Sequence, residues 1–211
     1  MSQELLKLLD TGISELDLLV STDIQNQLIQ YIELLHKWNQ ISNLTSVKNK
    51  KKMVSIHLLD SLAILPYITG TRILDVATGA GLPGIVLALC FPEKQFVLID
   101  SNKKKIRFIN QVVTELKIKN VVSQHVRIES FLCETIFDQI VSRAYTSLQA
   151  FIESTGHLAD DKTEYLGMKG QLPELEIAEL GAGYTVKSYP LIVPYIEGQR
   201  HLIIMTSNKN F

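Results

Sequence analysis

The sequence predicts an α/β fold, a doubly wound and mostly parallel sheet with an antiparallel edge strand and an N-terminal helical extension. From residue 69 onward, short apolar segments alternate with amphipathic helical segments. This alternation is typical of a parallel sheet with helices on both faces. The last two strand-like segments have no helix between them, and residues 1–68 show only helical patterns. We therefore expect a helical unit over 1–68 and a second unit over 69–211.

The N-terminal unit contains two segments with helical periodicity. Apolar side chains recur at three- and four-residue steps over residues 23–40, which predicts one buried helix face. Ser21 or Thr22 is suited to cap this helix. Trp38 continues the apolar stripe, so we expect it in the core rather than stacked on a nucleic-acid base. A second helix is expected over residues 53–67.

The second unit is expected to hold seven strands. Short apolar or alternating segments predict them at 73–76, 96–99, 121–122, 137–141, 165–168, 184–189 and 201–206. Helical segments lie between most of these strands, at 85–90, 102–116, 148–157 and 174–180. Because no helix separates the last two strands, they should pair antiparallel at one edge of the sheet.

Composition excludes several classes of protein. With 46% hydrophobic residues among 211, the chain can bury one sizeable core, and a net charge of −1 means that a nucleic-acid partner needs a local basic patch. Cys90 and Cys133 lie far apart, so we expect buried thiols and neither disulfides nor a metal site. Without a run of about 18 apolar residues or a leader-like start, we expect a cytoplasmic protein without a membrane span.

Residues 75–84, DVATGAGLPG, follow an expected strand and lead into a helix. They contain G-x-G-x-x-G at Gly79, Gly81 and Gly84, which lets a ligand approach the backbone closely. Asp100 ends the second strand, 21 residues after Gly79, where a carboxylate can accept hydrogen bonds from ribose hydroxyls. The motif alone fits both a nicotinamide dinucleotide and S-adenosylmethionine.

The presence of Asp75 distinguishes between these two possible ligands. A carboxylate four residues before Gly79 would repel a pyrophosphate at the helix terminus. S-adenosylmethionine carries a sulfonium and an ammonium instead, which favour an acid nearby. The D-x-x-x-G-x-G spacing also resembles the first motif of S-adenosylmethionine-dependent methyltransferases. The alternative is that Asp75 only caps the loop backbone. Pro83 is expected only to begin the helix.

Further motifs extend along nearly the whole chain: HKWN (36–39), NLTS (43–46), HLLDS (57–61), LIDS (98–101), SRA (142–144), KGQ (169–171) and GQRHL (198–202). Together with the glycine loop, this set resembles the bacterial RsmG (GidB) methyltransferases, which make 7-methylguanosine in 16S ribosomal RNA. The resemblance implies a Rossmann-like methyltransferase sheet and S-adenosylmethionine as cofactor, with S-adenosylhomocysteine as product. The implied partner is 16S ribosomal RNA within the small ribosomal subunit or its precursor.

The resemblance also assigns site residues by position. Arg143 is the candidate catalytic residue, Asp100 would hold the ribose, and Ile128 and Glu129 would flank the adenine. The full cofactor-binding set would be Asp75, Ala77, Gly79, Gly81, Leu82, Asp100, Ser101, Ile128, Glu129 and Arg143.

Two positions depart from the family pattern. Ala77 stands where glycine is usual, so cofactor binding should survive unless the backbone there needs a positive φ. Lys105 stands where arginine is usual, so a bidentate contact of an arginine guanidinium would be replaced by the point charge of a lysine ammonium.

Guanine N7 is a free lone pair, so methyl transfer to it needs alignment more than a general base. Candidate RNA contacts are His57, Lys169, Arg200 and the lysines Lys50, Lys51 and Lys52. For each, a structural role or a solvated surface is the alternative, as a surface salt bridge is for Arg143. His57, Asp60 and Ser61 are neighbours on one expected helix, so they cannot form a hydrolase relay.

Two other classes of function stay open. A dehydrogenase would need a redox-site His or Tyr near the nicotinamide, and the sequence offers no convincing candidate. A non-catalytic S-adenosylmethionine- or RNA-binding regulatory protein would share the same loops, and an assay of methyl incorporation separates it from an enzyme. We expect a monomer.

Overall fold

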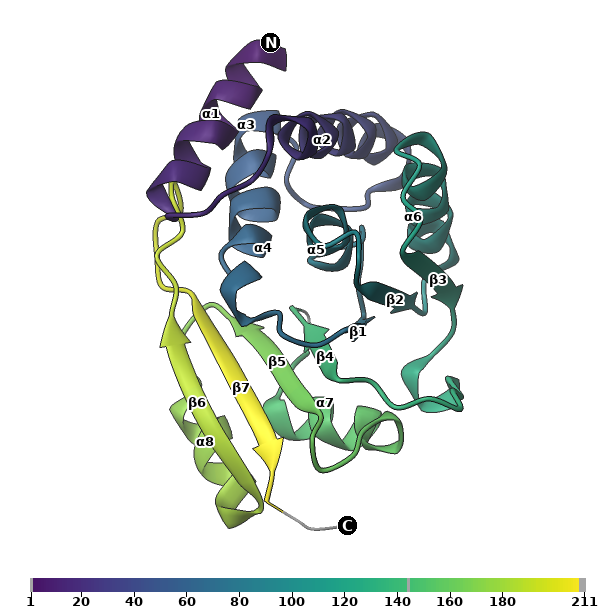
Figure 1. The fold of residues 1–211 in the computed structure, drawn as a ribbon, viewed down its shortest axis with the longest axis vertical. Coiled ribbons are helices and arrows are strands. Elements are labelled where there is room, and N and C mark those ends of the chain that lie inside the picture. Colours follow the sequence, from purple (N-terminus) through teal and green to yellow (C-terminus); the bar gives the residue numbers. More distant parts are fainter. Residues whose placement is uncertain (1, 144, 209–211) are drawn as a thin grey trace.

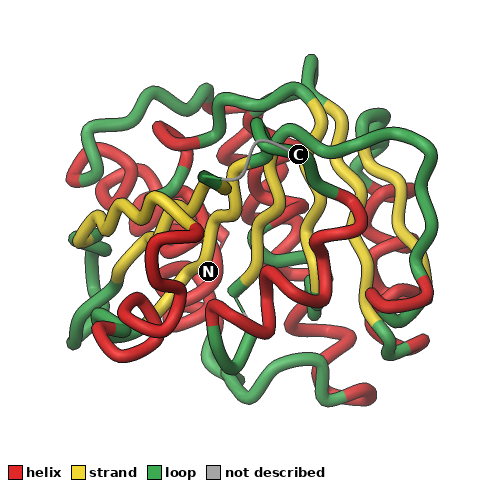
Figure 2. Tube along the Cα trace, turned by 90° about the horizontal axis from the view of Figure 1, so that it is seen from below, coloured by secondary structure: helices red, strands yellow, loops and turns green. Residues whose placement is uncertain are grey.

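A seven-stranded sheet with the strand order β3-β2-β1-β4-β5-β7-β6 forms the centre of the molecule. The computed structural model describes residues 2–143 and 145–208. Helices cover both sides of the sheet (Figures 1 and 2). The strands are β1 (Arg72–Val76), β2 (Gln95–Asp100), β3 (Val121–His125), β4 (Gln139–Ser142), β5 (Glu164–Lys169), β6 (Tyr184–Pro190) and β7 (His201–Ser207). The predicted α/β class and all seven predicted strands are confirmed.

Strand directions confirm that the last two strands pair antiparallel at one edge of the sheet, and they show which of the two is reversed. β1 to β5 pair in parallel, whereas β7 pairs antiparallel with both β5 and β6. The antiparallel strand is therefore β7, one place in from the edge, and the edge strand β6 runs in the same direction as β5. The two strands are adjacent in sequence and form a hairpin, so the hairpin, rather than a single reversed strand, occupies the edge of the sheet.

The N-terminal residues form α1 (Ser2–Glu15), α2 (Thr22–Ser42) and a third helical stretch. That stretch consists of α3 (Lys50–Met53), the π-helical segment η1 (Val54–Leu59) and α4 (Asp60–Leu62), where one regular helix was predicted. Of the two expected caps of α2, Ser21 occupies the position, and its hydroxyl accepts a hydrogen bond from the amide of Ile24.

The remaining helices are α5 (Gly84–Cys90), α6 (Lys103–Glu115), α7 (Leu148–Thr155) and α8 (Glu174–Leu180). The fourth strand begins at Gln139, later than predicted, because the chain before it turns: Phe137 is buried under the guanidinium of Arg72 and outside the ladder. Cys90 and Cys133 are free and half-buried, and burial raises the pKa of Cys90 to about 12.

Two hydrophobic clusters pack against the sheet. One contains α1, α2 and η1 side chains together with Ile85, Phe108 and Leu166, and the other lies with α7 and includes Val76 and Met205. The N-terminal helices thus share a cluster with the sheet, and Trp38 packs edge-on against Phe108 within it. The division into units at 68/69 stays a prediction. Within the described residues, no helix has the length and apolar character of a membrane crossing.

Candidate active site

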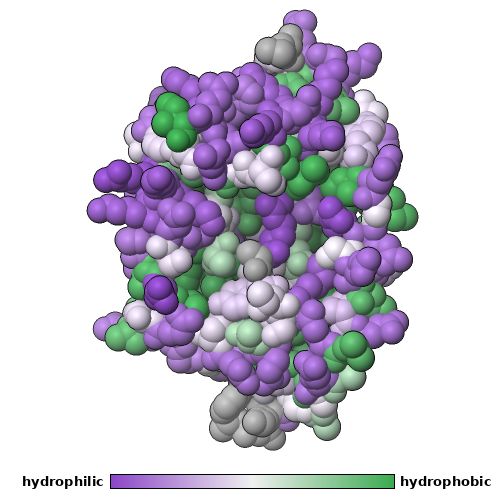
Figure 3. Space-filling model, turned by 180° about the vertical axis from the view of Figure 1, so that it is seen from behind, coloured by the Kyte–Doolittle hydropathy of each residue, from purple (hydrophilic) through white to green (hydrophobic). Residues whose placement is uncertain are grey.

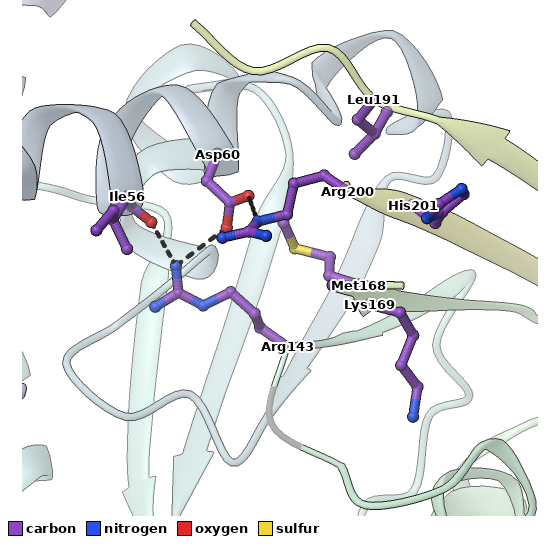
Figure 4. Close-up of a pocket in the computed structure, with 9 residues that line it drawn as sticks. Ile56, Asp60, Arg143, Met168, Lys169, Leu191, Arg200 and His201 are labelled. Atoms are coloured by element: carbon purple, nitrogen blue, oxygen red, sulfur yellow. Dashed lines mark hydrogen bonds and ion pairs between the residues drawn. The ribbon is translucent and has the colours of Figure 1, made fainter. Parts of the chain in front are cut away.

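Two cavities lie at the carboxyl ends of the parallel strands. The β2 cavity, of about 280 Å³, is lined by Val76, Ala77, Ile99, Asp100, Ser101, Val126, Arg127, Ile128, Glu129 and Tyr145. The arginine cavity, of about 290 Å³, is lined by Ile56, Asp60, Arg143, Met168, Lys169, Gly170, Leu191, Arg200 and His201 (Figure 4). Arg143 and Tyr145, two residues apart after β4, belong to different cavities. The two cavities are therefore neighbours.

The glycine loop after β1 is built from left-handed backbone. Gly79 has φ 64° and Gly81 has φ 87°, and a Cβ on Gly81 would lie 2.5 Å from Ile85 Cγ1. Both positions therefore favour glycine, and Gly81 has the added restriction of the close contact with Ile85. Ala77 also has a positive φ, of 56°. Alanine was expected to leave cofactor binding intact only if the backbone at this position did not need a positive φ, and that condition is not met. Ala77 carries backbone strain of about 1–2 kcal/mol.

Asp75 lies beneath this loop and is completely buried. Its Oδ2 accepts hydrogen bonds from Thr78 Oγ1 at 2.6 Å and from the amide of Gly84 at 2.7 Å. Its Oδ1 has no hydrogen-bond partner among the described residues. Burial raises the pKa of Asp75 to about 7, although both hydrogen bonds oppose the shift. Asp75 thus caps the loop and the start of α5, the role that the sequence left as the alternative, and a direct contact with the cofactor stays a prediction.

Asp100 is held rigidly at the end of β2. Its Oδ2 accepts hydrogen bonds from the amide of Gly79 at 2.9 Å and from Lys105 Nζ at 3.2 Å, and its Oδ1 accepts one from the amide of Asn102 at 2.8 Å. The carboxylate thus ties the glycine loop to the first turn of α6. The ion pair with Lys105 was not predicted from the sequence. Of the other predicted cofactor residues, Ala77, Ser101, Ile128 and Glu129 line the β2 cavity, whereas Gly81 and Leu82 are buried in the loop and do not.

Asp60 joins two arginines in the arginine cavity. Arg143 Nη1 donates to Asp60 Oδ2 at 3.4 Å and to the carbonyl of Ile56 at 3.1 Å, and Arg200 Nε donates to Asp60 Oδ1 at 3.2 Å. Asp60 is only 4% exposed. Its burial raises its pKa, and the two arginines oppose that shift. Arg143 is therefore paired inside a cavity rather than on an open surface, and it lies outside the lining of the β2 cavity.

Lys169 lies at the end of β5 and lines the same cavity. Its Nζ contacts Glu176 Oε2 at 2.8 Å and the carbonyl of Tyr145 at 3.4 Å. Glu176 also accepts a hydrogen bond from the amide of Leu148, at the start of α7. Lys169, Arg143 and Arg200 were each predicted from the sequence, and the fold brings all three to one cavity. Asp60 was considered only as part of a hydrolase relay, although it stands inside the HLLDS motif.

Comparison with known proteins decides the family. The family model GidB, described as rRNA small subunit methyltransferase G, matches residues 24–203. The chain is 48% identical to ribosomal RNA small subunit methyltransferase G of Pseudomonas aeruginosa, over 92% of each chain. It is 45% identical to the protein of the same name from Salmonella arizonae, over 99% of this chain and 100% of the relative. This chain belongs to the GidB family.

Solved structures confirm the fold. The O-methyltransferase TomG from Streptomyces achromogenes, crystallised with S-adenosylmethionine, has a TM-score of 0.64 at 14% identity, over 95% of this chain and 96% of that one. A ribosomal protein L11 methylase from Lactobacillus delbrueckii has a TM-score of 0.56 at 16% identity, over 76% and 80%. The predicted family, the methyltransferase class and S-adenosylmethionine as cofactor are confirmed for this GidB protein, and neither alternative class of function is favoured.

His57 of the GidB protein lies outside both cavities. The residue is 4% exposed, and its Nε2 lies 3.0 Å from Thr45 Oγ1. Burial, followed by the charge of Arg143, lowers the pKa of His57 to about 4. The ring is thus neutral and has no surface that RNA could reach, which supports the structural role. Ser61 donates to the carbonyl of His57.

The lysines at 50–52 are only partly free. Lys50 forms an ion pair with Glu33 of α2, and Lys51 forms one with Glu4 of α1. Lys52 is exposed and has no ion pair within the described part of the chain. Two of these three charges are therefore neutralised on the protein itself. No group of three or more potential metal ligands occurs among the described residues.

Proposed function

We propose that this protein transfers a methyl group from S-adenosylmethionine to N7 of one guanine in 16S ribosomal RNA. Its substrate is the small ribosomal subunit or its precursor, and it acts as a monomer in the cytoplasm. One observation carries this proposal: a cavity suited to a nucleoside cofactor adjoins a cavity lined by three cations, with Tyr145 in the lining of the first and Arg143 in the lining of the second.

The β2 cavity fits S-adenosylmethionine better than a dinucleotide. Ile99 and Ile128 supply apolar surface for a flat base, and the carboxylate of Asp100 supplies acceptors for ribose hydroxyls. The amide of Gly84 at the start of α5, where a pyrophosphate would bind, is already bonded to the buried Asp75. Asp75 lies beneath the glycine loop with an unpartnered Oδ1, so a phosphate at the start of α5 would lie close to a buried carboxyl group.

When bound, S-adenosylmethionine supplies a methyl carbon that accepts the N7 lone pair of guanine. The electron pair of the broken carbon–sulfur bond stays on sulfur, and the positive charge passes to the guanine ring. N7 carries no proton, so the protein needs no general base. Its residues act by alignment. The partly exposed side chain of Arg143 is suited to donate to guanine O6, which leaves the neighbouring N7 free.

The arginine cavity also suits an RNA backbone. Arg143, Arg200 and Lys169 bring three cations together, and the paired carboxylates Asp60 and Glu176 offset only part of that positive charge. The face shown in Figure 3 is mostly hydrophilic, with apolar side chains in small separate groups, and it is hollowed near its centre. Because general electrostatic attraction is weak, the shape of the folded RNA must supply specificity. We therefore expect efficient methylation of assembled particles and poor methylation of naked transcript.

The decisive experiment supplies tritiated S-adenosylmethionine and small subunits from cells that lack this protein. The expected result is one methyl group per 16S RNA, mapped to guanine N7 by borohydride–aniline cleavage. Large subunits, transfer RNA and naked 16S transcript serve as parallel substrates. Methylation spread over transfer RNA or large-subunit RNA, with none in the small subunit, would refute the proposal.

A further inference from the structure

One buried carboxylate links three distant parts of the chain. Asp60 comes from the N-terminal helices, Arg143 follows β4 and Arg200 precedes β7. Each oxygen of Asp60 accepts from a different arginine, and the two guanidinium groups converge on it from the sheet (Figure 4). The side chain of Asp60 is 6% exposed, whereas those of Arg143 and Arg200 are 27% and 29% exposed. The carboxylate thus stands behind the arginines, and the arginines face the cavity.

This arrangement sets the arginine geometry before RNA binds. Arg143 has a second acceptor in the carbonyl of Ile56, one helical turn before Asp60, so both of its anchors belong to the same helical stretch. Without the carboxylate, two like charges would face each other across the cavity and repel. Long arginine side chains would then adopt other rotamers, and each would lose entropy again on binding its target.

The carboxylate also compensates charge. Methyl transfer moves a positive charge onto guanine, and the unpaired guanidinium groups of Arg143 and Arg200 would oppose it. A negative charge buried behind both arginines reduces this opposition in the transition state, without offering guanine a competing contact.

On the basis of the proposed function, we propose that Asp60 is a positioning residue of the methyl transfer. It holds Arg143 and Arg200 in the orientation that receives guanine, and it offsets their charge while guanine becomes cationic. Asp60 itself does not touch the base.

The first test is Asp60→Asn. Asparagine offers one acceptor oxygen where two are used, and its amide group would face one guanidinium. We expect kcat on small subunits to fall about 30-fold, which corresponds to about 2 kcal/mol, while the KM for subunits changes about threefold and the affinity for S-adenosylhomocysteine stays unchanged. Asp138→Asn is the matched control, because Asp138 bonds the amides of Thr71 and Arg72 at the other end of β1. We expect that control to lower thermal stability and leave kcat unchanged.

A double-mutant cycle with Arg200→Gln separates positioning from stability. If Asp60 acts through Arg200, the two substitutions are not additive in kcat, and the double variant is little slower than the slower single variant. A merely structural Asp60 would give additive effects on kcat. If Asp60→Asn does not fold, Asp60→Glu tests the idea instead: its carboxylate is displaced by one methylene, so kcat should fall about tenfold with unchanged cofactor affinity.

The outcomes distinguish this role from the proposed function. A wild-type enzyme that methylates no guanine N7 in small subunits refutes the function, and the role of Asp60 with it. An active wild type together with a folded Asp60→Asn whose kcat lies within threefold of it overturns only the role of Asp60. Additive effects in the cycle, or a fully active Asp60→Glu where asparagine cannot fold, overturn it as well.

Discussion

The hydroxyl of Tyr31 donates a hydrogen bond of 2.9 Å to the carbonyl of Ala80, in the middle of the glycine loop. Tyr31 is fully buried on α2, and its burial raises its pKa far above the ordinary value, so the hydroxyl keeps its proton. Gly79 and Gly81 on either side of Ala80 have positive φ angles. The N-terminal helices therefore hold the most irregular part of the glycine loop through one polar contact.

Tyr31→Phe should loosen this loop without disturbing the apolar packing. It removes one hydrogen bond and leaves the buried carbonyl of Ala80 unsatisfied, so we expect a loss of about 1–3 kcal/mol in the free energy of unfolding. Affinity for S-adenosylhomocysteine, measured by calorimetry, should fall severalfold. Tyr195→Phe, which removes an exposed hydroxyl bonded to Glu15, is the control and should change neither quantity. Unchanged stability and affinity in Tyr31→Phe would show that the loop holds its shape alone.

Ala77→Gly should stabilise the protein. Ala77 has φ 56°, where a Cβ costs about 1–2 kcal/mol and glycine costs nothing sterically. Part of that gain is lost because glycine raises the entropy of the unfolded chain, so we expect a net gain of about 0.5–1 kcal/mol in urea denaturation. Ala88→Gly within α5 is the control, and we expect the opposite sign there, because that alanine lies in a regular helix. Destabilisation by Ala77→Gly would contradict the strain.

Asp100→Ala should weaken cofactor binding more than any other change at the β2 cavity. The carboxylate accepts a hydrogen bond from the amide of Gly79 and is proposed to hold the ribose, so we expect the affinity for S-adenosylhomocysteine to fall by about 1.5–3 kcal/mol. Calorimetry with NAD should show no binding to either protein. Lys105→Ala, which leaves the carboxylate and both backbone bonds in place, should have a smaller effect. Tight binding of NAD would contradict the choice of cofactor.

Local sequence patterns predicted the helices and strands, whereas the candidate site depends on contacts between residues that are far apart in the sequence. Alternating and helical periodicity located every strand, and Ser21 was found as a cap because capping is a property of neighbouring residues. The link between Asp60 and Arg200 has no local signature, since 140 residues separate the pair. The π-helical turn η1 was missed, and the positive φ of Ala77 was raised only as a condition that the sequence could not decide. Both features depend on how the chain packs, so the local residue pattern does not predict them.

Lys52 should contribute more to RNA binding than Lys50, although the two are near neighbours. Lys50 is paired with Glu33, whereas Lys52 is exposed and unpaired within the described residues. If Lys52 contacts one phosphate, Lys52→Gln should raise the KM for small subunits and lower the slope of log affinity against log salt by about 0.7–0.9. Lys50→Gln is the matched control and should leave that slope nearly unchanged. Equal slopes in both variants would place the RNA elsewhere.

His57 should make the fold sensitive to acid. Burial lowers the pKa of His57 to about 4 from an ordinary 6.5, so below pH 6.5 the unfolded chain takes up a proton that the folded chain refuses. The stabilising effect of the neutral ring is complete above pH 6.5, and at most about 3 kcal/mol of it is lost as the pH falls to 4. Asp75 acts in the opposite sense over this window, because burial raises its pKa to about 7 and the folded state then binds the proton more tightly.

The measurement is therefore the difference in unfolding free energy between wild type and His57→Gln, by urea denaturation from pH 7 to pH 4. We expect His57→Gln to be less stable at pH 7, where the bond to Thr45 is altered, and to recover relative to wild type as the pH falls. His125→Gln, at an exposed position on β3, is the control and should follow wild type throughout. A constant difference between wild type and His57→Gln across the window would contradict the buried neutral ring.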